Sequence, residues 1–292
     1  AADVENKGIE LSLSGSPIKN DNFKWDITYT FTKNMNEVTK LMDGYDRIDI
    51  NSAYGVQYSA VKGKPIGSYY VLGTKTTDSG QPIVNANTGM YETTSDLQYA
   101  GNSQRDFVMG LQNSFKYKNF RLAVSMDWKQ GGDFYSYTKR LSHFVGNGIE
   151  TTYNDRNPFI VPNSVNEHVD ATTGAISYTE NTTAVGFEDV YGFYNDTNNP
   201  AIEKTHIIDK TFVRLREASL YYDFPTQIAQ NLGLNKITLG IYGRNLFMWT
   251  PGENPYTDPE TTSYGTGVSS DFGEFGANPS QRAYGGVIKL SF

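Results

Sequence analysis

The stretch from Phe120 to Lys129 alternates strictly between apolar and polar side chains. Its apolar members begin with Phe120 and end with Trp128, and the opposite set includes Arg121, Asp127 and Lys129. This alternation has the period of a β-strand, in which successive side chains point to opposite faces of a sheet. The stretch is therefore predicted to be a strand with one apolar face and one charged face.

The same alternation recurs in six further segments. They are centred on Ile9–Leu13, Phe23–Thr32, Phe107–Tyr117, Glu217–Phe224, Ile237–Tyr242 and Tyr284–Phe292. Helical periodicity is confined to a short stretch, Thr226–Leu232, which follows Pro225 and can be capped by Gly233. The pattern therefore predicts an all-β fold with seven antiparallel strands.

The connections between these strands alternate in length. Ser16–Asp21, Lys118–Asn119 and Pro225–Lys236 are short, whereas the links between them run to roughly 70, 80 and 35 residues and are rich in Gly, Asn, Thr, Ser and Tyr. Short turns at one rim and long loops at the other are typical of outer-membrane β-barrels. A soluble antiparallel sheet with one wet face gives the same alternation within its strands and stays open as an alternative.

The length of the strands fits a membrane wall. Ten residues at about 3.3 Å each, tilted by about 45°, cover roughly 23 Å, which is close to the apolar band of a barrel. The apolar face is then expected to meet lipid and the charged face a wet lumen. Phe120 and Trp128 would lie at the two ends, where barrels carry aromatic girdles.

Composition excludes several other classes of protein. The chain has no cysteine, and its three histidines do not have the spacing of a zinc site, so no metal or other cofactor is expected. The formal charge is −7, and Lys and Arg do not cluster along the sequence, so no basic surface for nucleic acid is expected. No GxSxG motif is present, and the adjacent Ser142 and His143 would point to opposite faces of a strand, so an enzyme is not expected.

Several motifs, taken in order, resemble a known family. They are NKGIELSLSG (Asn6–Gly15), GKPIGSYY (Gly63–Tyr70), YKNFRLAVSMDWKQGGDFYS (Tyr117–Ser136), RNPFIVPNSV (Arg156–Val165), FVRLREASLYYDFP (Phe212–Pro225), GRNLFMWT (Gly243–Thr250), DPE (Asp258–Glu260) and GVIKLSF (Gly286–Phe292). Together they resemble the C-terminal region of SusC/RagA-family TonB-linked outer-membrane transporters. The resemblance covers nearly the whole chain.

The resemblance implies the fold and the function. Residues 1–292 would be the C-terminal portion of a 22-stranded transmembrane barrel, without the plug domain and the N-terminal strands. The parent protein would import large nutrients, such as oligosaccharides or peptides, with a SusD-like surface lipoprotein and with TonB acting through the plug. It would lie in the outer membrane with its C-terminus in the periplasm. A soluble glycan-binding β-sandwich, or a smaller barrel that acts as a porin or an enzyme, is the alternative.

Two sets of residues are candidates for specific roles. Loop residues that can hydrogen-bond or stack on a ligand are Arg156, Asn157, Tyr69, Tyr70, Trp249 and Tyr256, although simple packing would also explain them. The last strand carries Tyr284, Ile288, Leu290 and Phe292, which resemble the signal read by the barrel-assembly machinery.

The remaining charges allow two predictions. Asp258 and Glu260, with Asp271 and Glu274 nearby, are interpreted as solvated loop acids rather than a calcium site, because they lack regular ligand spacing. A network of charges on the inner wall is expected from Glu10, Lys24, Asp26, Arg121, Asp127, Lys129, Glu217 and Asp223.

Overall fold

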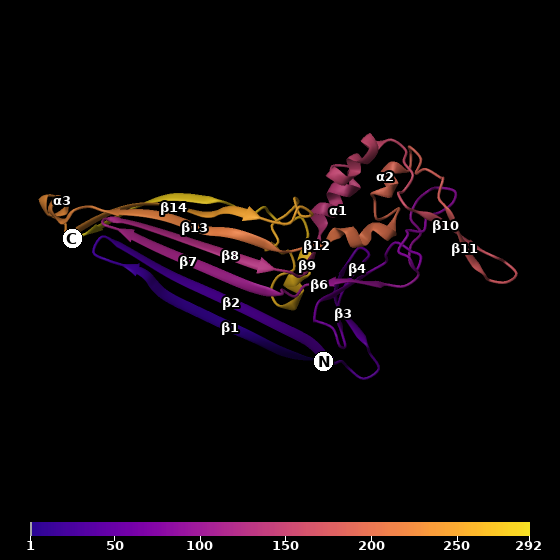
Figure 1. Ribbon diagram of the computed structural model, residues 1–292, viewed down its shortest axis with the longest axis horizontal. Helices are drawn as coiled ribbons and strands as arrows, with labels where there is room; N and C mark the ends of the chain where they lie inside the picture. The colour runs from indigo at the N-terminus through magenta and orange to yellow at the C-terminus, as the bar shows by residue number, and fades with distance from the viewer. Residues whose placement is uncertain (1) are drawn as a thin grey trace.

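The computed structural model describes residues 2–292 and contains one large antiparallel sheet (Figure 1). Its seven strands lie side by side in chain order, and they are β1 (Asp3–Lys19), β2 (Phe23–Lys40), β7 (Phe107–Tyr117), β8 (Phe120–Gln130), β13 (Phe212–Asp223), β14 (Lys236–Trp249) and β16 (Ala283–Ser291). Each predicted strand is present, and the all-β prediction is confirmed.

The short connections lie together at one end of the sheet (Figure 1). Lys118 and Asn119 form the tight turn between β7 and β8, and Lys118 has a φ of 49°. The predicted helix is present as α3 (Thr226–Asn231), and Gly233 follows it with a φ of 71°, a conformation that favours glycine after a helix. None of the helices within residues 2–292 is long and apolar enough to cross a membrane.

The three long loops gather at the opposite end and carry the remaining elements; together they are called the loop region. The first, residues 41–106, holds β3 (Arg47–Ala53), β4 (Val56–Val61), β5 (Ser68–Val71) and β6 (Gln98–Asn102). The second, residues 131–211, holds β9 (Asp133–Ser136), α1 (Tyr137–Phe144), η1 (Ile149–Arg156), β10 (Val165–Val169), β11 (Ile176–Glu180), α2 (Val190–Phe193), η2 (Pro200–His206) and β12 (Ile207–Asp209). The third, residues 250–282, holds η3 (Val268–Asp271) and β15 (Gly273–Glu274).

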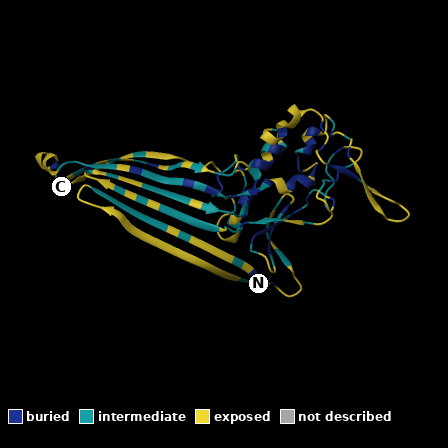
Figure 2. Ribbon diagram, viewed as in Figure 1, coloured by how far each residue is buried: buried dark blue, intermediate teal, exposed yellow. Residues whose placement is uncertain are grey.

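The main hydrophobic core of the protein lies in the loop region rather than on the sheet (Figure 2). Tyr58 and Tyr69 from the first loop pack against Tyr135 from the second and Phe272 from the third. β9 also pairs with both β12 and β15, which joins the second loop to the third. The three loops therefore fold as one packed unit.

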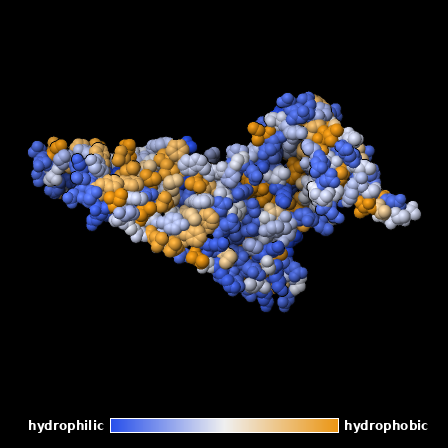
Figure 3. Space-filling view, viewed as in Figure 1, coloured by the Kyte–Doolittle hydropathy of each residue, from blue (hydrophilic) through white to orange (hydrophobic). Residues whose placement is uncertain are grey.

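Within residues 2–292, nothing covers the apolar face of the sheet in this way. Ile241 and Ile288 are 65% and 70% exposed on it, and apolar side chains spread over the strands (Figure 3). Aromatic side chains mark both ends, with Phe120 packed at a tilt against Tyr222 at the turn end and Trp128 packed edge-on against Phe107 at the loop end. A contiguous apolar surface of this kind marks a contact with lipid or protein rather than with water.

A β-bulge in β13 keeps this face continuous. The pairing of β13 with β8 shifts between Leu215 and Glu217, so Arg216 is an extra residue. Leu215 lies opposite Met126 before the bulge, and Ala218 lies opposite Val124 after it. Since one additional residue reverses the alternation, the apolar positions change from odd to even numbers while staying on one face.

A charge introduced on each face in turn should show which face meets lipid and which meets water. If the apolar face meets lipid, Val124→Arg should cost about 2–4 kcal/mol near mid-bilayer and lower the amount of folded protein in the membrane fraction. Ser125→Arg is the matched control, because Ser125 lies on the charged face opposite Glu217. Heat-dependent gel mobility of the membrane fraction measures the folded amount, and equal loss or equal tolerance of both variants would contradict the assignment.

Candidate functional site

The third long loop folds back over the charged face of the sheet and is fixed there by ion pairs. Glu260 Oε1 lies 2.6 Å from both Lys129 Nζ and Arg216 Nη2, and Glu260 Oε2 lies 3.2 Å from Arg214 Nη1. Asp258 accepts a hydrogen bond from Arg214, and both of these side chains are buried. The two acids therefore fix residues 258–260 to strands β8 and β13.

The ring of Phe212 packs against the cations of this cluster. It is 1% exposed and pairs with Lys129 in the sheet. Its ring centroid lies 5.1 Å from the guanidinium carbon of Arg214 and 5.4 Å from that of Arg105. The Lys129 ammonium lies 5.5 Å from the same centroid. Cations at these distances are attracted to the ring, most strongly where water is excluded.

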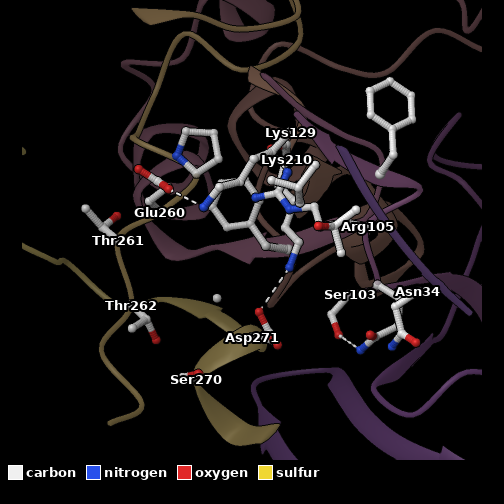
Figure 4. Close-up of a pocket in the computed structure, with 17 residues that line it drawn as sticks. Asn34, Ser103, Arg105, Lys129, Lys210, Glu260, Thr261, Thr262, Ser270 and Asp271 are labelled. Atoms are coloured by element: carbon white, nitrogen blue, oxygen red, sulfur yellow. Dashed lines mark hydrogen bonds and ion pairs between the residues drawn. The ribbon is translucent and has the colours of Figure 1, made fainter. Parts of the chain in front are cut away.

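A cavity of about 380 Å³ opens beside this cluster, between the sheet and the third loop (Figure 4). Its lining includes cations, acids and neutral hydrogen-bonding groups, namely Arg105, Lys129, Lys210, Glu260, Asp271, Asn34, Ser103, Gln104, Thr261, Thr262 and Ser270. Lys210 Nζ lies 3.2 Å from Asp271 Oδ1 at one side. This mixture suits a polar ligand that both donates and accepts hydrogen bonds.

Burial and pairing shift the ionisation of the groups around the cavity. Burial alone would raise the pKa of Glu260, but hydrogen bonds from Arg216 and Lys129 outweigh it and lower that pKa to about 2. Burial lowers the pKa of Lys210 to about 8, against the opposing effect of Asp271, and lowers the pKa of Arg105 to about 10. Glu260 therefore stays ionised at neutral pH. The pKa of Lys210 lies closer to neutral pH than the pKa of a free lysine does.

The interpretation of the acids as solvated loop residues holds for Asp271, which is exposed, and is wrong for Asp258 and Glu274, which are buried; Glu260 is half-buried. Asp258 and Glu260 bind the arginines of β13, and Asp271 pairs with Lys210. Glu274 is fully buried, and its Oε1 accepts hydrogen bonds from Thr138 N at 2.7 Å and from Ser136 Oγ at 2.9 Å. It thereby satisfies a backbone N–H in the first turn of α1, whose N-cap is Ser136. Each of these four carboxylates thus contacts a cation or an N–H or O–H group of the protein.

Ion pairs extend across the rest of the charged face, as the sequence predicts. Arg121 lies 3.0 Å from Asp223, and Arg216 lies 2.5 Å from Asp127. Lys24 pairs with Asp26 at 2.8 Å and Glu217 with Arg244 at 3.0 Å, whereas Glu10 is exposed.

The six candidate ligand residues do not converge on one place. Tyr69 is 0% exposed and donates a hydrogen bond to the carbonyl oxygen of Phe272 at 2.7 Å, so it is a core residue with no ring face free for stacking. Trp249 lies opposite Val213 on the apolar face and stacks on Phe247 with ring centroids 6.0 Å apart. Its position fits the aromatic band at the loop end rather than a ligand platform.

Of the other four, Tyr70 lies in the first loop, whereas Tyr256, Arg156 and Asn157 all contact residues 146–154 of the second. The Tyr70 ring lies 5.3 Å from the guanidinium carbon of Arg47, and Tyr256 donates a hydrogen bond to Glu150. Arg156 and Asn157 are exposed and bond to nearby backbone oxygens, those of Gly146 at 2.8 Å and Asn154 at 3.0 Å. The candidate assembly residues all project from the C-terminal strand with large exposed areas, namely Tyr284, Ile288, Leu290 and Phe292.

The cavity residues Arg105 and Lys210, and Arg214 in the adjacent ion-pair cluster, were absent from the sequence-based candidates. Arg214 and Arg216 alternate with apolar residues in the VRLRE stretch, a pattern that places both on the charged face once the bulge is known. Arg105 and Lys210 stand alone in the long loops, and no sequence spacing marks them.

Comparisons with known proteins agree on one class. The chain is 26% identical to TonB-dependent receptor P3 of Formosa agariphila, over 99% of the chain and 29% of the receptor. It is 32% identical to TonB-dependent receptor SusC of Bacteroides thetaiotaomicron, over 42% of the chain and 14% of SusC. The chain thus spans less than a third of these relatives. No family model matches it.

Solved structures agree on the fold. The RagAB peptide transporter aligns with a TM-score of 0.65 and 16% identity, over 100% of this chain and 30% of that chain. The RagAB peptide importer in the "open-open" state aligns with a TM-score of 0.62 and 17% identity, over 100% and 29%. The sequence relatives are TonB-dependent receptors. Within that class, the matches confirm the predicted resemblance to the SusC/RagA family.

The buried ion pair that fixes the third loop can be tested directly. Asp258→Asn removes one partner of a buried pair, and such a loss costs about 3–5 kcal/mol. Amide hydrogen exchange in residues 250–272 should become faster. Glu253→Gln is the matched control, because Glu253 is an exposed acid in the same loop. Equal protection of this segment in both variants would show that the pair does not hold the loop.

Proposed function

We propose that this chain forms part of the wall of a SusC-like TonB-dependent transporter in the outer membrane. The observation that carries the proposal is the apolar sheet face, which is uncovered within residues 2–292 and bounded by aromatic side chains at both ends. A lipid-facing barrel wall has these features. A β-sandwich would instead cover such a face with a second sheet.

The rest of the barrel and the plug are proposed to come from the remainder of a longer protein. β1 pairs only with β2, and β16 only with β14, among the described residues. Open strand edges in lipid leave backbone groups without partners, at several kcal/mol each, so these two edges need neighbouring strands. The relatives are more than three times as long as their match to this chain, which leaves room for those strands.

The cargo is proposed to be a large nutrient, either an oligosaccharide or a peptide. The cavity on the charged face offers both donors and acceptors to such a polymer. A SusD-like lipoprotein would cover the loop region, and the exposed residues Arg156 and Asn157, with Tyr70 and Tyr256, are proposed to touch cargo or this lid. TonB would supply energy through the plug.

The proposed orientation rests on the different lengths of the connections at the two ends of the sheet. In outer-membrane barrels the long loops are extracellular and the short turns periplasmic. The loop region would therefore face the exterior, and Phe292 would lie on the periplasmic side, where the barrel-assembly machinery can read the last strand.

Purification of the native protein from outer membranes tests this proposal. Its intact mass should be several times 32.6 kDa, with this chain at its C-terminus, and a SusD-like lipoprotein should co-purify in mild detergent. Deletion of the gene should abolish uptake of one class of oligosaccharide or peptide. A native product of 32.6 kDa in the soluble fraction would overturn the proposal.

The assembly role of the last strand has a separate test. Deletion of Phe292 should lower the folded amount in the outer membrane, because the terminal aromatic residue is proposed to be part of the assembly signal. Phe292→Tyr, which keeps the ring, should assemble normally. Normal assembly of the deletion variant would reject this role while leaving the transporter proposal intact.

A further inference from the structure

The second long loop contains a buried group of potential metal ligands that the transport proposal does not use. Asp196 follows α2, Glu203 lies in η2, and His206 ends η2. Their side chains are 7%, 2% and 0% exposed, and one ligand atom from each lies within 4.8 Å of the others. Three metal-binding side chains thus converge in the interior, whereas acidic clusters usually lie at the surface.

Each of these residues has a buried polar atom without a hydrogen-bond partner among residues 2–292. The atoms are Asp196 Oδ1, Glu203 Oε1 and both ring nitrogens of His206. His206 Nδ1 lies 3.8 Å from Glu203 Oε2, which is too long for a hydrogen bond. Buried polar atoms are normally paired, and a histidine with both nitrogens unpaired needs a specific explanation.

We propose that Asp196, Glu203 and His206 bind a zinc ion, or a closely similar divalent transition metal. One imidazole nitrogen and two carboxylate oxygens form a ligand set that suits zinc, with a water or another small donor completing the coordination. The three ligand atoms would be among those that now lack partners. A hard ion such as calcium prefers six to eight oxygen ligands and fits this set poorly.

The surroundings hold the ligands in place. Arg140 Nε lies 2.6 Å from Asp196 Oδ2, which leaves Oδ1 free, and the Arg140 guanidinium lies 3.5 Å from the Tyr54 ring centroid. Outer partners of this kind orient a carboxylate toward a metal. Gly55 packs against Glu203, since a Cβ there would meet Glu203 Cγ at 3.3 Å. The first loop therefore closes the site from one side.

The proposed role of the metal is to tie the loop region together. The site joins η2 and α2 to Arg140 of α1 and to the Tyr54–Gly55 turn of the first loop. The chain has no cysteine, so no disulfide within it can do this. A metal that binds only the folded state raises the free energy of unfolding, and the increase grows with the logarithm of the ratio of metal concentration to Kd.

The test uses the full-length protein in detergent, stripped with a chelator and titrated with zinc. Wild-type protein should bind zinc at this site, and hydrogen exchange in residues 137–144 and 190–206 should slow on binding. His206→Gln and Glu203→Gln should each weaken this binding by more than about 100-fold, since loss of an outer partner alone costs about 10–100-fold. His168→Gln, at an exposed histidine in β10, is the matched control and should bind as wild type.

Anomalous diffraction at the zinc edge keeps the proposal testable if the variants fail to fold. A peak between Asp196, Glu203 and His206 in the wild-type protein would support it. No peak there after zinc soaking, or zinc binding unchanged in His206→Gln, would overturn it and would leave a buried water as the partner of these groups. Preferential binding of calcium at the site would overturn the assignment to a transition metal. None of these outcomes affects the transport proposal.

Discussion

An apolar sheet face needs nonpolar surroundings, and this requirement shapes the rest of the chain. The seven strands alternate so that one face is continuously apolar and the other carries ion pairs. In β13 the apolar positions change from odd to even residue numbers at Arg216, and the bulge there keeps them on the same face. Because the apolar face is not used for internal packing, the hydrophobic core that organises the chain lies in the loop region.

The loop region depends on contacts between segments far apart in sequence. Tyr69, Tyr135 and Phe272 come from three different loops and share one core. Asp258 and Glu260 then connect the third loop to cations that lie on Phe212. Ion pairs therefore hold the rim that would receive cargo against the sheet. In its cavity Lys129 and Lys210 are paired with Glu260 and Asp271, whereas Arg105 bonds to backbone oxygens.

Much of the sheet could be predicted from sequence, because alternation in a strand is a local property. The seven strands, the Lys118–Asn119 turn and the helix after Pro225 are all present. The strand ends were less predictable. β2 continues to Lys40, where pairing with β1 rather than apolar alternation maintains the strand.

The sites were harder to predict, since they are made by long-range contacts. Tyr69 looked like an exposed aromatic residue, but its burial depends on Phe272, some two hundred positions away. The acids of the third loop looked solvated until the arginines of β13 were placed beside them. Similarly, Asp196, Glu203 and His206 have no recognisable ligand spacing, and only the packing of α2 and η2 brings them together.

Single-cysteine labelling along β8 tests the central claim, that one face of this sheet meets lipid, most directly. The chain has no cysteine, so Leu122→Cys, Ala123→Cys, Val124→Cys and Ser125→Cys can be made in the full-length protein, cleared of any other cysteine and kept in native membranes. The account predicts that a water-soluble maleimide reacts at 123 and 125, and that a lipid-soluble reagent reacts at 122 and 124. Uniform labelling of all four positions by the water-soluble reagent, or the opposite alternation, would contradict it.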